Sequence, residues 1–116
     1  MDKNGQTIPN YHYEDLRRLA DLYAQSGLEN PAVIVDTNHS NSAKRFFEQP
    51  RIAKEVLHSM RQSQDINAIV KGLMIESYIE EGAQSPDGGM YGKSITDPCL
   101  GWQDTERLIL ELAEQM

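Results

Sequence analysis

The sequence predicts an α/β fold in which two parallel strands alternate with three helices in the order α-β-α-β-α. Two short apolar runs, residues 32–35 and 72–75, are flanked by segments whose apolar residues follow the period of a helix. Strands that are separated by a helix pair in parallel through a right-handed crossover. The length of 116 residues suits one small domain.

The first helix is expected over residues 13–26. Apolar or small side chains recur from Leu16 to Tyr23 at the spacing of one helix face, and Gly27 stands where helices commonly stop. The run 32–35 is rich in β-branched residues and does not alternate with polar ones. This pattern predicts a strand that is buried on both faces of a parallel sheet.

A second helix is expected to begin near Pro50, because proline suits the first turn of a helix. Its expected buried stripe consists of Ile52, Ala53, Val56, Leu57 and Met60. The polar stretch 63–67 is expected to end this helix. The apolar run 72–75 that follows is expected to be the second strand.

Residues 77–102 are rich in glycine and proline, which predicts a long loop rather than regular structure. Loops of this length in compact domains are usually functional. The last helix is expected from about Asp104, a favourable N-cap residue, with Trp102 as a packing anchor just before it. The apolar face of this helix is expected to contain Leu108, Ile109 and Leu112.

Composition excludes several classes of protein. The net charge of −7 argues against a nucleic-acid partner, because neutralising phosphates requires clustered lysine and arginine. No apolar run approaches the roughly 20 residues that span a bilayer, so no membrane association is expected. The first residues do not resemble a secretion signal, and the single cysteine, Cys99, agrees with a reducing compartment. A cytoplasmic protein is therefore expected.

Three residues are candidate ligands of a metal ion. His39 follows the run 32–35 and Glu76 follows the run 72–75, so the two parallel strands should bring both side chains to one edge. Asp97, in the long loop, can fold back to the same place. This ligand set suits Mn²⁺, Fe²⁺, Co²⁺ or Zn²⁺ better than Ca²⁺ or Mg²⁺. From spacing alone, however, a histidine beyond a strand is more often a hydrogen-bonded structural residue.

Other chemical motifs are weaker. The segment 92–94, Gly-Lys-Ser, is not a phosphate-binding loop, because the pattern requires glycine where Asp87 stands. Ser40 lacks the strand-turn-helix context of a catalytic nucleophile. Cys99 stands two residues after Asp97, so a fourth thiolate ligand is conceivable. A buried loop cysteine is the favoured interpretation, because free cysteine often behaves as a small apolar residue.

Several segments resemble, in the same order, the C-terminal third of the class I 3-deoxy-7-phosphoheptulonate (DAHP) synthases. They are Asn10-Tyr11-His12-Tyr13, Val35-Asp36-Thr37-Asn38-His39-Ser40-Asn41-Ser42, Met74-Ile75-Glu76-Ser77 with Glu81-Gly82, and Tyr91-Gly92-Lys93-Ser94-Ile95-Thr96-Asp97-Pro98-Cys99-Leu100-Gly101-Trp102. The last segment is the most specific. The resemblance covers nearly the whole chain from about residue 8.

The resemblance implies a transferase with a metal-dependent (β/α) barrel, the TIM barrel. The family condenses phosphoenolpyruvate with erythrose 4-phosphate in the first step of the shikimate pathway to aromatic amino acids. Residues 1–116 are then the C-terminal segment of such a barrel, from about its sixth helix to its end. Carried over by motif, the metal ligands are His39, Glu76 and Asp97. The family's cysteine ligand lies in an earlier strand, and Cys99 matches a different cysteine.

The resemblance also implies roles in the reaction. The metal would polarise the aldehyde of erythrose 4-phosphate while the phosphoenolpyruvate carbon attacks. We therefore assign His39 and Asp97 as catalytic residues, and Asp97 and Lys93 as candidate substrate-binding residues. The family's lysines and arginines that bind the substrate phosphates and carboxylate lie upstream, the last of them in an Arg-Gly-Gly segment that would fall just before Met1.

Two parallel strands cannot close a barrel. The chain is therefore expected to expose strand edges and an apolar face that other strands would normally cover. A second copy of the chain, giving a homo-oligomer, or a complementing N-terminal segment would complete the fold. The alternative is a noncatalytic remnant of the family that binds metal or oligomerises.

Overall fold

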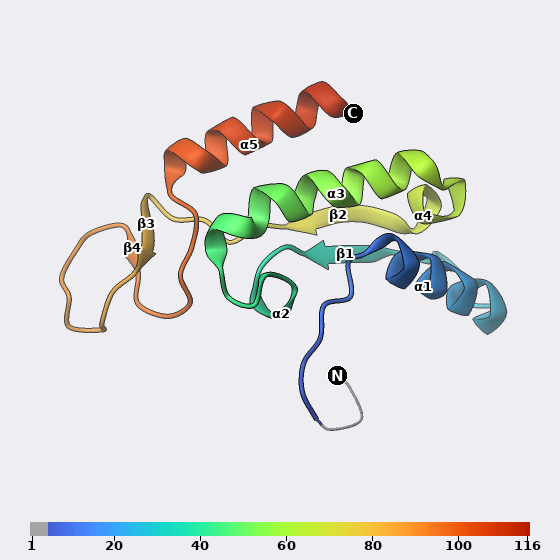
Figure 1. Ribbon diagram of the computed structural model, residues 1–116, viewed down its shortest axis with the longest axis horizontal. Helices are drawn as coiled ribbons and strands as arrows, with labels where there is room; N and C mark the ends of the chain where they lie inside the picture. Colours follow the sequence, from blue (N-terminus) through green and yellow to red (C-terminus); the bar gives the residue numbers. More distant parts are fainter. Residues whose placement is uncertain (1–4) are drawn as a thin grey trace.

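The computed structural model describes residues 5–116 and shows an α/β fold with two separate parallel strand pairs (Figure 1). The elements are α1 (Tyr13–Ser26), β1 (Val33–Asp36), α2 (His39–Ser42), a 3₁₀ turn (Phe46–Glu48), α3 (Gln49–Gln62), α4 (Gln64–Ile69), β2 (Val70–Met74), β3 (Glu80–Ala83), β4 (Lys93–Ser94) and α5 (Trp102–Gln115). The described residues form no closed barrel. None of their helices is long and apolar enough to cross a membrane.

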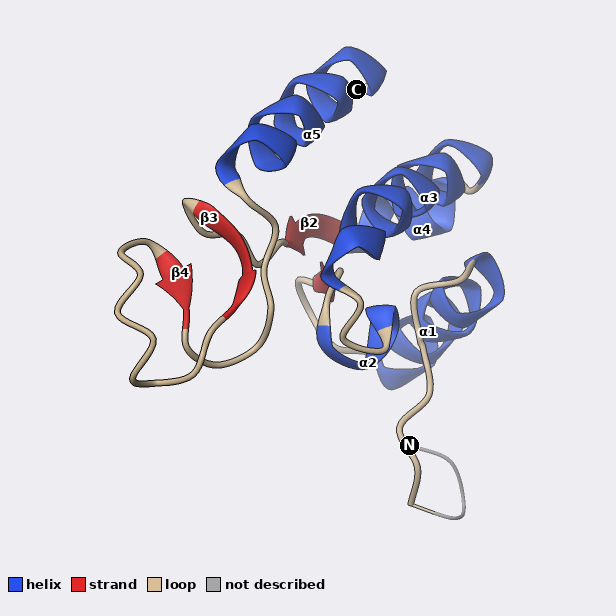
Figure 2. Cartoon of the chain, turned by 60° about the vertical axis from the view of Figure 1, so that its left-hand side comes forward, coloured by secondary structure: helices blue, strands red, loops and turns tan. Residues whose placement is uncertain are grey.

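The first strand pair, β1 and β2, forms the centre of the larger half of the molecule. The two strands pair in parallel, with Val35 opposite Leu73 and Asp36 opposite Met74, as the sequence predicts. Helices α1, α3 and α4 cover one face of the pair (Figure 2). The core beneath them consists of Tyr11, Leu16, Ala20, Val35, Ile52, Val56, Ile66, Ile69 and Val70.

The opposite face of this strand pair is bare. The register places Ile34 beside Gly72 and Asp36 beside Met74, so alternation along the strands turns Ile34 and Met74 to the same side. Their side chains are 56% and 49% exposed. The prediction of a strand buried on both faces is therefore wrong for this chain, because no second layer exists within residues 5–116. The exposed apolar face that we expected is present.

The connection between α3 and β2 is more regular than predicted. The polar stretch 63–67 ends α3 but also starts α4, because the Ser63 hydroxyl accepts a hydrogen bond from the Ile66 amide at 3.3 Å. Ile66 is fully buried, and this burial anchors the short helix. β2 consequently begins at Val70, two residues before the expected run 72–75.

The long loop predicted for residues 77–102 contains a second, smaller strand pair. β3 and β4 pair in parallel, with Glu80 opposite Lys93, and further bridges join Ser77 to Leu100 and Gly82 to Cys99. The prediction of irregular structure throughout is therefore wrong. Backbone hydrogen bonds between distant parts of the segment produce this order, and local glycine and proline content does not report on them.

Helix α5 begins earlier than expected and packs against α3. Its N-cap is Gly101, so Asp104 lies inside the first turn instead of capping it. Leu108 and Leu112 are buried, but Ile109 is 50% exposed because it points away from α3. Trp102 is 53% exposed and is not a packing anchor.

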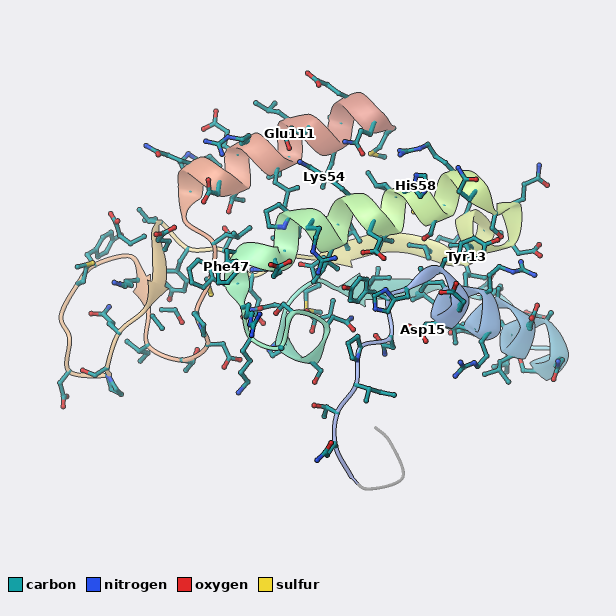
Figure 3. The ribbon with its side chains drawn as sticks, in the orientation of Figure 1. Tyr13, Asp15, Phe47, Lys54, His58 and Glu111 are labelled. Atoms are coloured by element: carbon teal, nitrogen blue, oxygen red, sulfur yellow. The ribbon has the colours of Figure 1, made fainter. Side chains whose placement is uncertain are left out.

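An ion pair and a second apolar core join these two helices. Lys54 of α3 and Glu111 of α5 form the ion pair (Figure 3). The second core consists of Ala53, Leu57, Leu100, Leu108 and Leu112. Met60 of the expected stripe on α3 is partly buried and touches both cores. Helix α5 is therefore attached to the larger half through α3.

Candidate metal centre

The site lies at the carboxyl ends of β1 and β2. The Thr37 amide donates to the Met74 carbonyl at 2.9 Å, which continues the strand pairing one residue beyond β1. His39 and Glu76 follow these strand ends by a few residues and therefore reach the same edge, as predicted. Parallel strands place ligands at this edge because all of them end there.

A buried glutamine fixes the backbone at this edge. Gln49, in the first turn of α3, has no exposed surface. Its side-chain oxygen accepts from the Glu76 amide at 2.8 Å, and its side-chain nitrogen donates to the Glu76 carbonyl at 2.9 Å. The same oxygen accepts from the Thr37 hydroxyl at 2.9 Å. Sequence reasoning missed Gln49, because the side chain acts through backbone groups distant in the chain.

The structure brings the three candidate ligands together. His39 Nε2 lies 2.8 Å from Glu76 Oε1 and 3.2 Å from Asp97 Oδ2. One ligand atom from each of the three residues lies within 4.8 Å of the other two. All three side chains are partly exposed, so an ion has access from solvent. One imidazole nitrogen and two carboxylate oxygens fit a divalent ion of the Mn²⁺, Fe²⁺, Co²⁺ or Zn²⁺ type.

His39 is surrounded by carboxylates on both sides of its ring. Its Nδ1 lies 2.7 Å from Asp36 Oδ2, on the side opposite Glu76 and Asp97. The hydrogen bond to Asp36 raises the pKa of His39, and the nearby negative charges add to this effect. Sequence reasoning did not single out Asp36, although it stands at the end of β1, three residues before His39.

Asp97 reaches the site through a tight turn and a buried asparagine. The Ser94 hydroxyl donates to the Asp97 carbonyl at 2.7 Å and closes the turn. Asn38, which is 1% exposed, donates to both Glu76 Oε2 and the Pro98 carbonyl at 3.3 Å. Asn38 thus links the end of β1 to the segment that carries Asp97.

Two lysines, Lys93 and Lys44, are considered as sources of positive charge near the site. The structure gives Lys93 no ion pair with residues 5–116, and it forms no hydrogen bond with the three candidate ligands. Its substrate-binding role stays a prediction. Lys44, which sequence reasoning missed, places its Nζ 3.7 Å from Asp97 Oδ1. It follows α2 in a left-handed conformation, a placement that no sequence pattern indicates.

Cys99 is a buried cysteine, which is the interpretation favoured above. Its Sγ donates to the Asp97 carbonyl at 3.3 Å and lies 3.9 Å from Glu76 Oε2. Burial raises the pKa of this thiol, and the neighbouring carboxylates act in the same direction.

Comparison with known proteins gives one consistent result. The profile of the DAHP synthetase I family matches residues 3–110. A Trp-sensitive phospho-2-dehydro-3-deoxyheptonate aldolase of Escherichia coli O6:H1 is 38% identical over 112 residues, which is 94% of this chain and 31% of that protein. A Tyr-sensitive enzyme of the same name from Enterobacter agglomerans is 38% identical over 116 residues, covering 97% of this chain and 53% of that protein.

A solved structure supports the same relationship. The phospho-2-dehydro-3-deoxyheptonate aldolase from Francisella tularensis SCHU S4 superposes with a TM-score of 0.78 and 29% sequence identity. The superposition covers 93% of this chain and 31% of that one. The chain thus spans about a third of the length of this structure and of the Escherichia coli relative.

Proposed function

The chain belongs to the DAHP synthetase I family, and we propose that it supplies the metal-binding part of a 3-deoxy-7-phosphoheptulonate synthase. The reaction is the condensation of phosphoenolpyruvate with erythrose 4-phosphate, with release of phosphate. The observation that carries the proposal is the convergence of His39, Glu76 and Asp97 on one point. Residues that are far apart in sequence meet there in a geometry that suits one divalent ion.

In this proposal His39 Nε2, Glu76 Oε1 and Asp97 Oδ2 hold the ion. When bound, a divalent ion of this kind supplies Lewis-acid polarisation of the substrate aldehyde. Gln49 keeps Glu76 in place through its two bonds to the Glu76 backbone. Asp97 Oδ1 is the oxygen that remains to accept a hydrogen bond from a sugar hydroxyl.

The phosphorylated substrates require positive charge close to this point. Lys93 is the candidate that the family motif suggests, and Lys44 offers an ammonium group beside Asp97. The family resemblance places the main cationic residues in the upstream part of the barrel. Full substrate binding therefore depends on groups beyond this chain.

We also propose that residues 1–116 act as the C-terminal segment of a (β/α) barrel. The bare face with Ile34 and Met74, and the open edges of β1 and β2, support this assignment. A complementing N-terminal segment, or a second copy of the chain, would cover them. Of the two, only the N-terminal segment would also bring the fourth ligand and the substrate-binding cations that the family resemblance places upstream.

Phosphate release is the test of this function. The chain is mixed with Mn²⁺ and both substrates, first alone and then with the remainder of the Escherichia coli relative supplied as a separate chain. We expect turnover when the complementing chain is present. Absence of turnover in both mixtures contradicts an enzymatic role.

The bare strand face also favours a second candidate function, a noncatalytic protein that binds metal or oligomerises. This candidate predicts a multimer that binds Mn²⁺ without turnover in either mixture. A His39→Ala variant would then lose metal but keep its fold and assembly. A monomer that catalyses the reaction at the rate of the full-length relatives refutes it.

A further inference from the structure

We propose that Asp36 is a positioning residue, which orients His39 so that Nε2 presents its lone pair to the metal. This inference rests on the proposed metal site and extends it to a residue outside the three ligands. It makes a claim about hydrogen-bond direction that can be tested in the metal-bound chain without measuring activity.

The first argument is the position of the imidazole ring. Its two nitrogens face different carboxylates, with Nδ1 at 2.7 Å from Asp36 and Nε2 at 2.8 Å from Glu76. Ionised carboxylates only accept, so without a metal ion each nitrogen can donate to the carboxylate that it faces. A cation bound by Glu76 and Asp97 takes the place of the proton on Nε2, and the proton on Nδ1 then donates to Asp36. In the neutral ring the lone pair then belongs to Nε2, the nitrogen that faces Glu76 and Asp97. Carboxylates commonly orient metal-binding histidines in this way.

The second argument is the backbone around the histidine. His39 has φ of 52°, a left-handed conformation that costs a non-glycine residue on the order of 1 kcal/mol. The other oxygen of Asp36 accepts from the Asn38 amide at 2.8 Å, and its carbonyl accepts from the Asn41 side chain at 2.8 Å. Asp36 therefore holds both the turn that carries His39 and the ring itself.

These two tasks can be separated by one substitution. In an Asp36→Asn variant the side-chain oxygen can still accept from the Asn38 amide, so the turn keeps its hydrogen bond. The amide nitrogen, however, replaces the acceptor at Nδ1 with a donor. The His39 proton is then favoured on Nε2, where it occupies the lone pair that the metal requires.

The primary measurement is the tautomer of His39 in the chain loaded with Zn²⁺, a diamagnetic ion that permits NMR. Long-range ¹H–¹⁵N NMR spectra of the imidazole, at a pH where the ring is neutral, report which nitrogen is protonated. We expect a protonated Nδ1 and a metal-bound Nε2 in the wild-type chain, and a smaller share of that form in the Asp36→Asn variant. A wild-type ring protonated on Nε2 overturns the proposal without any reference to the variant.

The second measurement is Mn²⁺ affinity by titration calorimetry. We expect the Asp36→Asn variant to bind Mn²⁺ about 10- to 100-fold more weakly, with an unchanged circular dichroism spectrum. Asp36→Glu, which keeps an acceptor, should recover part of the loss. The matched control is Asp21→Asn, an exposed aspartate on α1, which should leave the affinity unchanged. Equal affinities for wild type and Asp36→Asn contradict the positioning role.

The two proposals fail in different ways. If the wild-type chain binds Zn²⁺ through His39 Nε2 with the proton on Nδ1 but shows no turnover with the complementing chain, the proposed function fails and the orientation by Asp36 stands. If the chain binds Mn²⁺ but the tautomer does not respond to Asp36→Asn, the proposed function stands and the positioning role fails.

Discussion

His39 and Glu76 reach the site from the ends of two paired strands, whereas Asp97 reaches it from the segment between β4 and α5. The first two stand on a frame with a continuous apolar core and the buried Gln49. Residues 77–102, which include Asp97, are held mostly by backbone hydrogen bonds, and many of their apolar side chains are exposed, as Tyr91 is at 89%. We call the half that carries His39 and Glu76, from α1 to β2, the frame, and residues 77–102 with α5, which carry Asp97, the attachment.

Leu100 joins the attachment to the frame, in addition to Asn38 and the Lys54–Glu111 ion pair. Leu100 is 1% exposed and packs in the core between α3 and α5. Its amide donates to the Glu76 carbonyl at 3.1 Å, and its carbonyl accepts from the Tyr78 amide at 2.8 Å. The position of Asp97 therefore depends on a few contacts near Leu100, and single substitutions can weaken these contacts.

Leu100→Ala should have the largest effect, because it removes apolar packing between the attachment and the frame. Removing a fully buried leucine side chain costs about 2–5 kcal/mol of unfolding free energy. We also expect weaker Mn²⁺ binding, because Asp97 loses its anchor. Urea unfolding and calorimetry measure the two effects. The control is Leu110→Ala, which removes an exposed leucine of α5 and should change stability by less than about 0.5 kcal/mol.

Gln49→Leu should weaken the frame instead. The substitution keeps the volume but removes the acceptor of the Glu76 amide and a donor to its carbonyl. An unsatisfied buried polar group costs about 1–3 kcal/mol, so urea unfolding should show a loss of that size. Gln62→Leu, at the exposed end of the same helix, is the matched control. Equal stability of the two variants would show that Gln49 is not part of the frame.

Gly92→Ala should affect the attachment alone. Gly92 has φ of 78°, and a Cβ there would lie 2.9 Å from the Cβ of Ile79. We expect a loss of roughly 1 kcal/mol, with faster hydrogen exchange in β3 and β4 but not in β1 and β2. Gly89→Ala provides the comparison, since its φ is 75° but no atom lies within 4 Å. Faster exchange in β1 would contradict the separation of the two regions.

Lys54→Ala should have the smallest effect. The ion pair with Glu111 joins α3 to α5, but both side chains are more than a third exposed. Solvent screening limits such pairs to about 0–1 kcal/mol. A double-mutant cycle with Glu111→Ala measures the coupling between the two residues. A coupling above that range would mean that α5 depends on charge more than on Leu108 and Leu112.

The frame could be predicted from sequence because it follows local periodicity. The helix spacing around Leu16 and the apolar runs that became β1 and β2 indicated the parallel pair, and the strand ends indicated that His39 and Glu76 would meet. The attachment could not be predicted this way. β3 and β4 depend on pairing between residues far apart. Spacing alone left the approach of Asp97 to His39 a minority interpretation, and the family resemblance made it the favoured one. Asp36 and Gln49 escaped notice because their partners are largely backbone groups or a single imidazole nitrogen.

The bare face of β1 and β2 has a consequence for the behaviour of the chain in solution. Two open strand edges beside exposed Ile34 and Met74 are a template for self-association. The net charge of −7 acts against it, because copies of an acidic chain repel one another at long range. Added salt shortens the range of that repulsion without weakening apolar contacts. Ionic strength therefore controls the colloidal stability of the chain, and a partner with a basic surface has an advantage over a second copy.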